Sequence, residues 1–118
     1  MLRRNLRLTN GKLFHAIYGK GDKAVGKFMV IYLRRNGLDH NRYGFSVSKK
    51  IGNAVERNRV KRRLRETVRL HHHRLLDGYD LIMVARTAAG NTKFLNLENE
   101  FISLLTEKKL IKECESHD

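Results

Sequence analysis

The sequence lacks the features that mark several classes of protein. Its 118 residues include one cysteine, Cys114, and no proline. A single cysteine cannot form an internal disulfide, which fits a reducing compartment. No apolar run approaches the roughly 20 residues of a membrane span. The start of the chain lacks the apolar core of a secretory signal, although its arginines would also suit a transit peptide. We therefore expect a cytoplasmic protein that does not cross a membrane.

Repeats and low-complexity linkers are absent as well, so we expect residues 1–118 to form a single domain. A chain of this length can build its own core without metals or disulfides. The hydrophobic fraction of 41% argues against general disorder. We expect only the last residues, 113–118, to fray.

Acidic residues are too few to balance the basic ones. The chain has 25 Lys and Arg against 12 Asp and Glu, which gives a net charge of +13 at pH 7. The excess lies in the first two-thirds of the chain, with +7 in residues 1–41 and +9 in residues 42–74, whereas residues 98–118 carry −3. Self-repulsion of this size costs stability, so we expect an anionic partner that neutralises it. Nucleic acid is the first candidate and a membrane surface the second.

The hydrophobic pattern predicts a helix, two strands, a second helix, a third strand and a last helix. The strands are expected at 28–35, 43–48 and 79–86, and the last is nearly continuous in apolar residues, as central strands are. The helices are expected from about 10 to 18, from 54 to about 75, and from 94 to about 111. Residues 19–27 are expected to form a turn or loop. This order favours an α+β or α/β sandwich with helices against one small sheet.

The second helix is the most informative segment. Asn53 and Glu56 have the spacing of a capping box. Apolar residues recur every four positions from Val60 to Val68, so they form one stripe. Six of the nine residues in 57–65 are Arg or Lys. The pattern predicts a folded helix that docks on a core and presents cations to a polyanion, with strongly salt-dependent binding. The alternative is an ordinary solvated face.

A second binding surface is predicted from aromatic and small polar residues. Ser46 and Ser48 would place hydroxyls on one strand face, where a polynucleotide backbone can approach closely; ordinary strand alternation explains them equally well. Phe14, Tyr18 and Tyr32 lie among basic residues. They are either core residues or platforms on which unpaired bases stack.

No catalytic or metal site is predicted. The aspartates lie in expected turns or at a strand start, which disfavours a protein-only nuclease with clustered acids. His71, His72 and His73 are consecutive, and consecutive helical side chains point about 100° apart, so the three cannot converge on one ion. We expect them at a solvated helix end.

Residues 42–66, RYGFSVSKKIGNAVERNRVKRRLRE, closely resemble the protein subunit of bacterial ribonuclease P. The resemblance extends more weakly from the Leu6-Arg7-Leu8 start into the last helix. It implies a two-layer α-β sandwich with a four-stranded sheet and a left-handed βαβ crossover, like the second domain of ribosomal protein S5. It also implies that the partner RNA, with bound Mg²⁺, carries the chemistry while the protein assists.

The resemblance implies two binding surfaces, one for each of two RNAs. The first would contact one copy of the ribonuclease P RNA through Arg42, Lys49, Lys50, Asn53, Arg57, Asn58, Arg59, Lys61, Arg62 and Arg65. The second would hold the 5′ leader of precursor tRNA in a cleft lined by Phe14, Tyr18, Val30, Tyr32, Ser46 and Ser48. The acidic end from Glu98 onward contrasts with the basic tails of the family, so we infer that it lies away from RNA.

Two other classes of function stay open at this point. A ribosomal protein or a general RNA-annealing factor would bind many RNAs without improving cleavage. A protein-only nuclease would cleave RNA without an RNA partner.

Overall fold

The computed structural model describes residue 19 and residues 21–112. The predicted helix near residues 10–18 therefore lies outside the described residues, as do Phe14 and Tyr18. The described helices and strands are β1 (Asp22–Val25), β2 (Met29–Arg35), β3 (Arg42–Ser46), α2 (Ala54–His71), β4 (Tyr79–Ala85) and α3 (Phe94–Glu107). Three short 3₁₀ turns connect them: η2 (Lys49–Ile51), η3 (His72–Arg74) and η4 (Thr87–Asn91).

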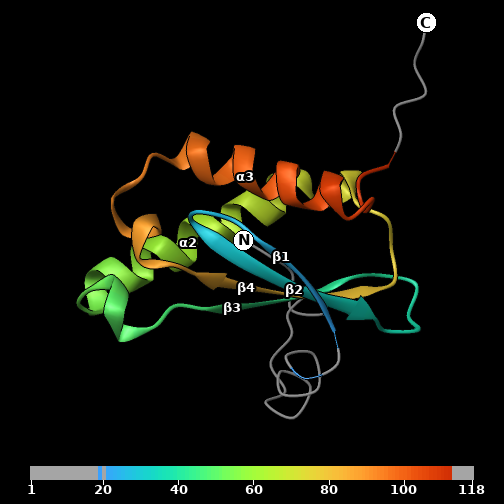
Figure 1. The fold of residues 1–118 in the computed structure, drawn as a ribbon, viewed down its shortest axis with the longest axis horizontal. Coiled ribbons are helices and arrows are strands. Elements are labelled where there is room, and N and C mark those ends of the chain that lie inside the picture. Colours follow the sequence, from blue (N-terminus) through green and yellow to red (C-terminus); the bar gives the residue numbers. More distant parts are fainter. Residues whose placement is uncertain (1–18, 20, 113–118) are drawn as a thin grey trace, which may run out of the picture.

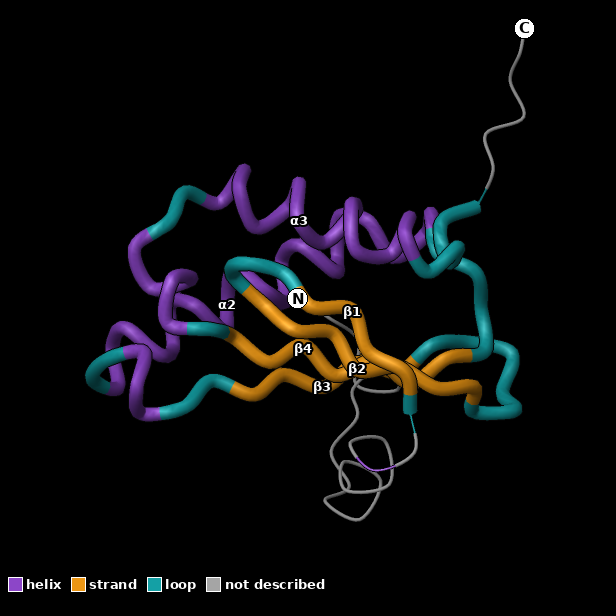
Figure 2. The backbone as a smooth tube through the Cα atoms, in the orientation of Figure 1, coloured by secondary structure: helices purple, strands orange, loops and turns teal. Residues whose placement is uncertain are grey.

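The four strands form one mixed sheet in the order β1-β2-β4-β3. The pairs β1–β2 and β2–β4 are antiparallel, whereas β3 and β4 are parallel and joined through α2. Helices α2 and α3 cover the same face of the sheet, so the fold is a two-layer α+β sandwich (Figures 1 and 2). The four-stranded sheet implied by the resemblance and the central position of the strand at 79–86 are confirmed.

The core lies between the sheet and the two helices. Alternate residues of β2 and β4 point into it, as the two-residue period of a strand requires. The apolar stripe predicted for α2 is confirmed, because Val60, Leu64 and Val68 are fully buried. Helix α3 packs beside α2 on the same face of the sheet and adds Leu97, Phe101 and Leu105 to the core.

The predicted capping box at the start of α2 is confirmed. The side chain of Asn53 accepts a hydrogen bond from the backbone N–H of Glu56, and the Glu56 carboxylate accepts one from the backbone N–H of Asn53, both at 2.9 Å. Gly52 precedes the box with φ of 153°, and a Cβ there would lie 2.1 Å from Glu56 Oε1. Glycine at this position therefore lets the carboxylate fold back over the helix start.

Several predicted boundaries are wrong. Residues 19–27 are not all loop, because β1 pairs with β2 along the edge of the sheet. Helix α2 ends at His71, four residues earlier than expected, and continues as the η3 turn. Helix α3 ends at Glu107 because Lys109 adopts a positive φ of 62°, which turns the chain. The chain then returns to the end of α2, where Leu76 N–H bonds to the Leu110 carbonyl at 2.7 Å.

Helix α3 fastens the turn between β1 and β2 through one carboxylate. Glu100 accepts hydrogen bonds from the backbone N–H groups of Lys27, Phe28 and Met29 at 2.7, 2.8 and 2.9 Å. A Cβ on Gly26 would lie 2.4 Å from the carboxyl carbon of Glu100, so only glycine lets the carboxylate reach this turn. The edge hairpin and the last helix are therefore held together by charge-assisted hydrogen bonds.

Replacing Glu100 with Ala should lower the free energy of unfolding by about 3 kcal/mol, because three backbone N–H groups lose a charged acceptor. Urea denaturation followed by circular dichroism measures the change. Glu107→Ala, an exposed change on the same helix, is the matched control and should stay within about 0.5 kcal/mol of the original protein. Equal denaturation midpoints for the two variants would contradict the role of Glu100.

Candidate nucleic-acid interface

Helix α2 presents the predicted cations on a rigid element. Val60, Leu64, Thr67 and Val68 are buried against the core, so most of the other residues of the helix face outward or sideways. Arg57, Lys61 and Arg62 form no ion pair or side-chain hydrogen bond with any described residue. Lys49 and Lys50, in η2 just before the helix, are exposed and likewise lack a side-chain partner among the residues that the structure describes.

The α2 cations divide between two sides of the helix. On the side toward β3, the Arg65 guanidinium lies 5.9 Å from the ring centre of Phe45. On the side toward α3, Arg63 Nη1 donates to the Thr92 carbonyl at 2.8 Å, and Arg59 Nη2 approaches the Gly90 carbonyl at 3.5 Å. Arg62 lies between these two sides and is exposed. The cations therefore spread over a broad part of the helix surface, and those on its two sides are held by contacts with β3 and with the segment before α3.

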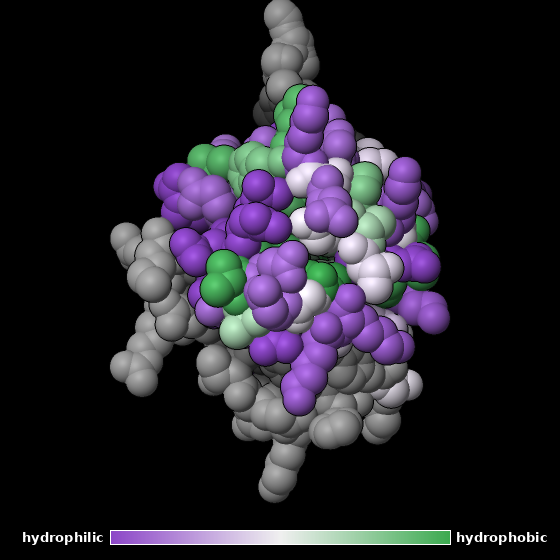
Figure 3. Space-filling model, turned by 90° about the vertical axis from the view of Figure 1, so that its left-hand side faces the viewer, coloured by the Kyte–Doolittle hydropathy of each residue, from purple (hydrophilic) through white to green (hydrophobic). Residues whose placement is uncertain are grey.

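The end of the molecule near the start of α2 is largely hydrophilic. Figure 3 views this end, and hydrophilic residues cover most of its described surface, with apolar atoms only in small patches. The exposed polar groups here include Asn53 and Asn58, which were predicted to face RNA. Such a surface suits a solvated, anionic partner better than an apolar one.

A second group of predicted residues lies on the sheet face that points away from α2 and α3, where Val30, Tyr32 and Ser46 are partly exposed. Cross-strand pairing places Tyr32 opposite Ile82, and Ile82 beside Gly44. The next row holds Val30, Val84 and Ser46. Directly opposed residues share a face of the sheet. The structure therefore brings together the three predicted leader residues Val30, Tyr32 and Ser46.

Ser48 lies outside strand β3, so the prediction that Ser46 and Ser48 share one strand face is wrong. Strand β3 ends at Ser46, two residues earlier than expected. The Ser48 hydroxyl instead accepts a hydrogen bond from the backbone N–H of Lys50 at 3.3 Å and caps η2. Its position supports the Lys49-Lys50 turn. Whether Ser48 also touches a leader stays a prediction.

Arg42 stands apart from the other predicted RNA ligands. It forms a two-pronged ion pair with Asp80, with Nε–Oδ1 and Nη2–Oδ2 distances of 2.8 Å each. Asp80 is fully buried and also accepts a hydrogen bond from the Asn36 amide at 3.0 Å. The hydrogen bonds to Asp80 raise the pKa of Arg42. Both residues belong to the sheet face opposite α2, so Arg42 is not grouped with the helix cations.

The histidine cluster is not a freely solvated helix end, contrary to expectation. His71 Nε2 lies 2.8 Å from Glu98 Oε2, and both side chains are about one-fifth exposed. This contact joins the end of α2 to α3, while His72 begins the η3 turn. Within the described residues, no group of three or more His, Cys, Asp or Glu side chains is arranged to hold a metal ion.

Sequence reasoning missed two features of the interface. Arg63 was counted in the basic run, but nothing local indicated that it would anchor the loop before α3. Phe94 was assigned only to the helical pattern, yet the structure brings it beside the α2 arginines. Both contacts join segments about 30 residues apart, which local periodicity cannot reveal.

Over the same described residues, no helix is both long and apolar enough to cross a membrane.

The fold and its surfaces define a small, basic α+β protein in which a cationic helix covers one side of a four-stranded sheet. A family model described as Ribonuclease P matches residues 2–109. The chain is 36% identical over 110 residues to the ribonuclease P protein component of Syntrophomonas wolfei, covering 93% of this chain and 92% of that one. It is 42% identical over 99 residues to the same component of Natranaerobius thermophilus, covering 84% and 86%.

Solved structures agree with these relatives. The RNase P protein of Staphylococcus aureus superposes with a TM-score of 0.83 at 36% identity, covering 91% of this chain and 98% of that one. The RNase P protein from Thermotoga maritima gives 0.79 at 28% identity, covering 86% and 96%. The chain therefore belongs to the ribonuclease P protein family.

Replacing Arg42 with Ala should lower the free energy of unfolding by about 3 kcal/mol, because Asp80 would stay buried without its cation. The value is at the low end for a buried pair because the Arg42 side chain is 26% exposed. Urea denaturation measures the change, and Arg62→Ala provides a control that removes an exposed cation of the same kind. A loss no larger than that of Arg62→Ala would show that Asp80 does not depend on Arg42.

Proposed function

We propose that this chain is the protein subunit of a ribonuclease P ribonucleoprotein, in which it binds the catalytic RNA and the 5′ leader of precursor tRNA. The observation that carries the proposal is the group of cations on α2, of which Arg57, Lys61 and Arg62 have no side-chain partner among the described residues. Cations held on a rigid helix neutralise phosphates and release their counterions on binding. Because the chain belongs to the ribonuclease P protein family, we infer that the polyanion bound by these cations is ribonuclease P RNA.

In this proposal the RNA carries the chemistry and the protein assists. The Mg²⁺ ions needed for endonucleolytic removal of the leader would be held mainly by the RNA. A subunit with net charge +13 reduces the repulsion between two RNAs, so less Mg²⁺ is needed to bring them together. One protein would bind one RNA, in the cytoplasm.

The geometry supports two adjoining RNA surfaces. The α2 cations lie above the helix-covered side of the sheet, whereas Val30, Tyr32 and Ser46 lie on its other face. Strand β3 is at the sheet edge between them, and Arg65 reaches over its inner face to Phe45. A ribozyme bound along α2 would therefore meet a leader lying across the sheet near β3, where the mature 5′ end has to be placed.

Cleavage of a precursor tRNA at limiting Mg²⁺ tests the proposal, with three reactions: protein alone, ribonuclease P RNA alone, and both together. We expect the mature 5′ end to form only, or much faster, when both are present. No stimulation of the RNA would favour a general RNA-binding protein. Cleavage by the protein alone would point to a protein-only nuclease.

Arg62→Ala and Arg65→Ala should each weaken binding of ribonuclease P RNA and reduce the slope of log affinity against log salt by roughly one, because each removes one phosphate contact. Filter binding at several salt concentrations measures the slope. Lys109→Ala, which removes an exposed cation in the turn after α3, is the matched control. Unchanged slopes in both arginine variants would exclude this helix from the interface.

Tyr32→Ala should weaken binding of precursor tRNA to the assembled ribonucleoprotein about tenfold while leaving mature tRNA nearly unaffected, because only the precursor carries a leader base to stack on the ring. Tyr32→Phe keeps the ring and serves as the control. Parallel titrations of the two tRNAs give the comparison. Equal losses for precursor and mature tRNA would contradict a leader surface on this face.

A further inference from the structure

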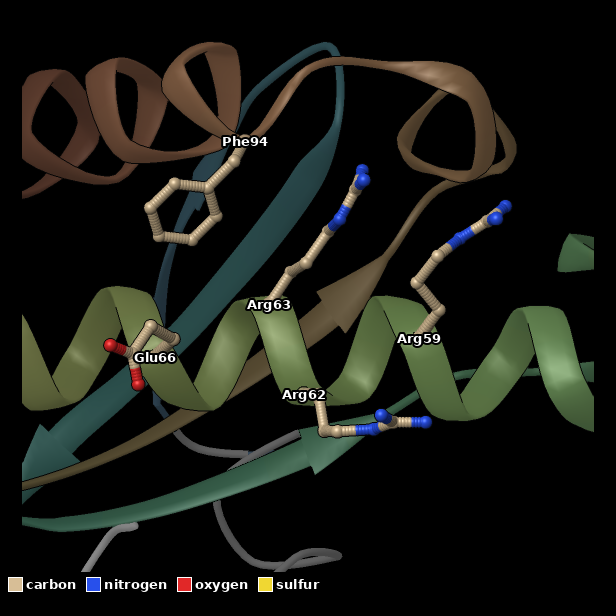
Figure 4. Close-up of a pocket in the computed structure, with 5 residues that line it drawn as sticks. All are labelled: Arg59, Arg62, Arg63, Glu66 and Phe94. Carbon is tan, nitrogen blue, oxygen red and sulfur yellow. The ribbon is translucent and has the colours of Figure 1, made fainter.

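A pocket opens between α2 and the start of α3. It has a volume of about 440 Å³, within the range of roughly 300–1,000 Å³ that is common for small-ligand sites. Because α2 and α3 cover one face of the sheet, this pocket lies apart from the predicted leader surface on the other face. It is lined by Arg59, Arg62, Arg63, Glu66 and Phe94 (Figure 4).

Phe94 is an unusual residue for such a position. It is the first residue of α3 and is partly exposed. Among the described residues, the partly buried hydrophobic side chains that pack on the core do not include it. Figure 4 shows its ring above α2, at one end of the pocket. A ring that does not serve the core keeps its face available for stacking.

The arginines around the pocket are of two kinds. Arg63 is fixed by its hydrogen bond to the Thr92 carbonyl at 2.8 Å, so its guanidinium plane loses little freedom when a ligand arrives. Arg62 has no partner among the described residues, and Arg59 is held only by the long 3.5 Å contact to the Gly90 carbonyl. Arg59 and Arg62 therefore keep hydrogen-bond donors for an anion.

The fifth residue, Glu66, makes the two ends of the pocket differ in charge. Glu66 lies toward the Phe94 end of the pocket, while Arg59 lies at the opposite end (Figure 4). Arg69 holds the Glu66 carboxylate through a hydrogen bond of 2.9 Å. A carboxylate repels phosphate, so an anionic group is favoured at the Arg59 end. An aromatic ring at one end and free guanidinium groups at the other match the two parts of a nucleotide.

We propose that this pocket takes one unpaired nucleotide of the partner RNA, with its base against Phe94 and its phosphate at Arg59 and Arg62. The inference rests on the proposed function and adds a specific contact to it. Binding of RNA to α2 then includes stacking on Phe94 as well as charge neutralisation, because one base must leave its stack to enter the pocket. Stacking on an aromatic side chain tolerates any base, so the site selects an unpaired position rather than a sequence.

The test compares the affinity of ribonuclease P RNA for the original protein, Phe94→Leu and Phe94→Tyr at several salt concentrations. Phe94→Leu keeps an apolar side chain but loses the π-face, so we expect about tenfold weaker binding with an unchanged salt slope. Phe94→Tyr keeps the ring and should bind like the original protein. Leu95→Ala, at a 61% exposed neighbour, is the control for a change at the start of α3. Thermal melting by circular dichroism checks that each variant is folded.

A direct readout comes from photocrosslinking. Ribonuclease P RNA that contains 5-iodouridine is bound to the protein, irradiated, and digested for mass spectrometry. We expect an adduct on the peptide that contains Phe94, formed from an unpaired uridine and lost in Phe94→Leu.

The outcomes separate the two proposals. If the original protein binds and stimulates the RNA but Phe94→Leu binds as tightly and no adduct forms at Phe94, only the pocket inference is overturned. If the original protein neither binds nor stimulates the RNA, the proposed function fails and the inference fails with it. A loss in both Phe94→Leu and Phe94→Tyr would also overturn the stacking contact, because the second variant keeps the ring.

Discussion

The docking of α2 on the sheet is the interaction on which the rest of the structure depends. The helix carries six Arg or Lys among nine residues, including Arg57, Lys61 and Arg65 at four-residue spacing. Like charges at that spacing destabilise a helix by about 0.2–0.5 kcal/mol per pair. Burial of one Val or Leu side chain contributes about 1.5–3 kcal/mol. The buried stripe therefore outweighs the repulsion, and a dense row of cations can be held in a fixed geometry.

The two sides of α2 are then positioned by different neighbours. Toward β3, the helix lies over Phe45 in the parallel β3–β4 unit. Toward α3, Arg63 and the His71–Glu98 contact connect it to the last helix. Helix α3 in turn is fixed to the far edge of the sheet by Glu100. The buried apolar layer between the sheet and the two helices sets how these elements pack. The polar contacts then fix the helices at particular points on the sheet and on each other.

The sequence predicted well what depends on neighbouring residues. The capping box, the buried stripe of α2 and the central strand β4 each follow from a local pattern, and all are confirmed. Strand β1 was missed because DKAV is short and polar, with only Ala24 buried, as in many edge strands. The family resemblance supplied the fourth strand that periodicity had not revealed.

What could not be predicted depends on residues far apart in the chain. Asp80 was assigned to a strand start, but it is the buried partner of Arg42, 38 positions earlier. His71 was expected in solvent because the acid that meets it, Glu98, belongs to another helix. Ser48 alternates correctly with Ser46 in sequence, yet the strand ends between them and its hydroxyl serves a cap. In each case the role of the side chain depends on a contact that the local sequence pattern does not contain.

The position of β3 at the sheet edge has a further consequence for solubility. Within the described residues β3 pairs only with β4, and an edge strand offers unpaired backbone groups to any other extended chain. Here Lys49 and Lys50 follow the end of the strand, and Arg65 lies over Phe45 on its inner side. Two copies that approached edge to edge would bring these cations together and repel each other. The same positive charge therefore opposes edge-to-edge pairing of two copies of the chain.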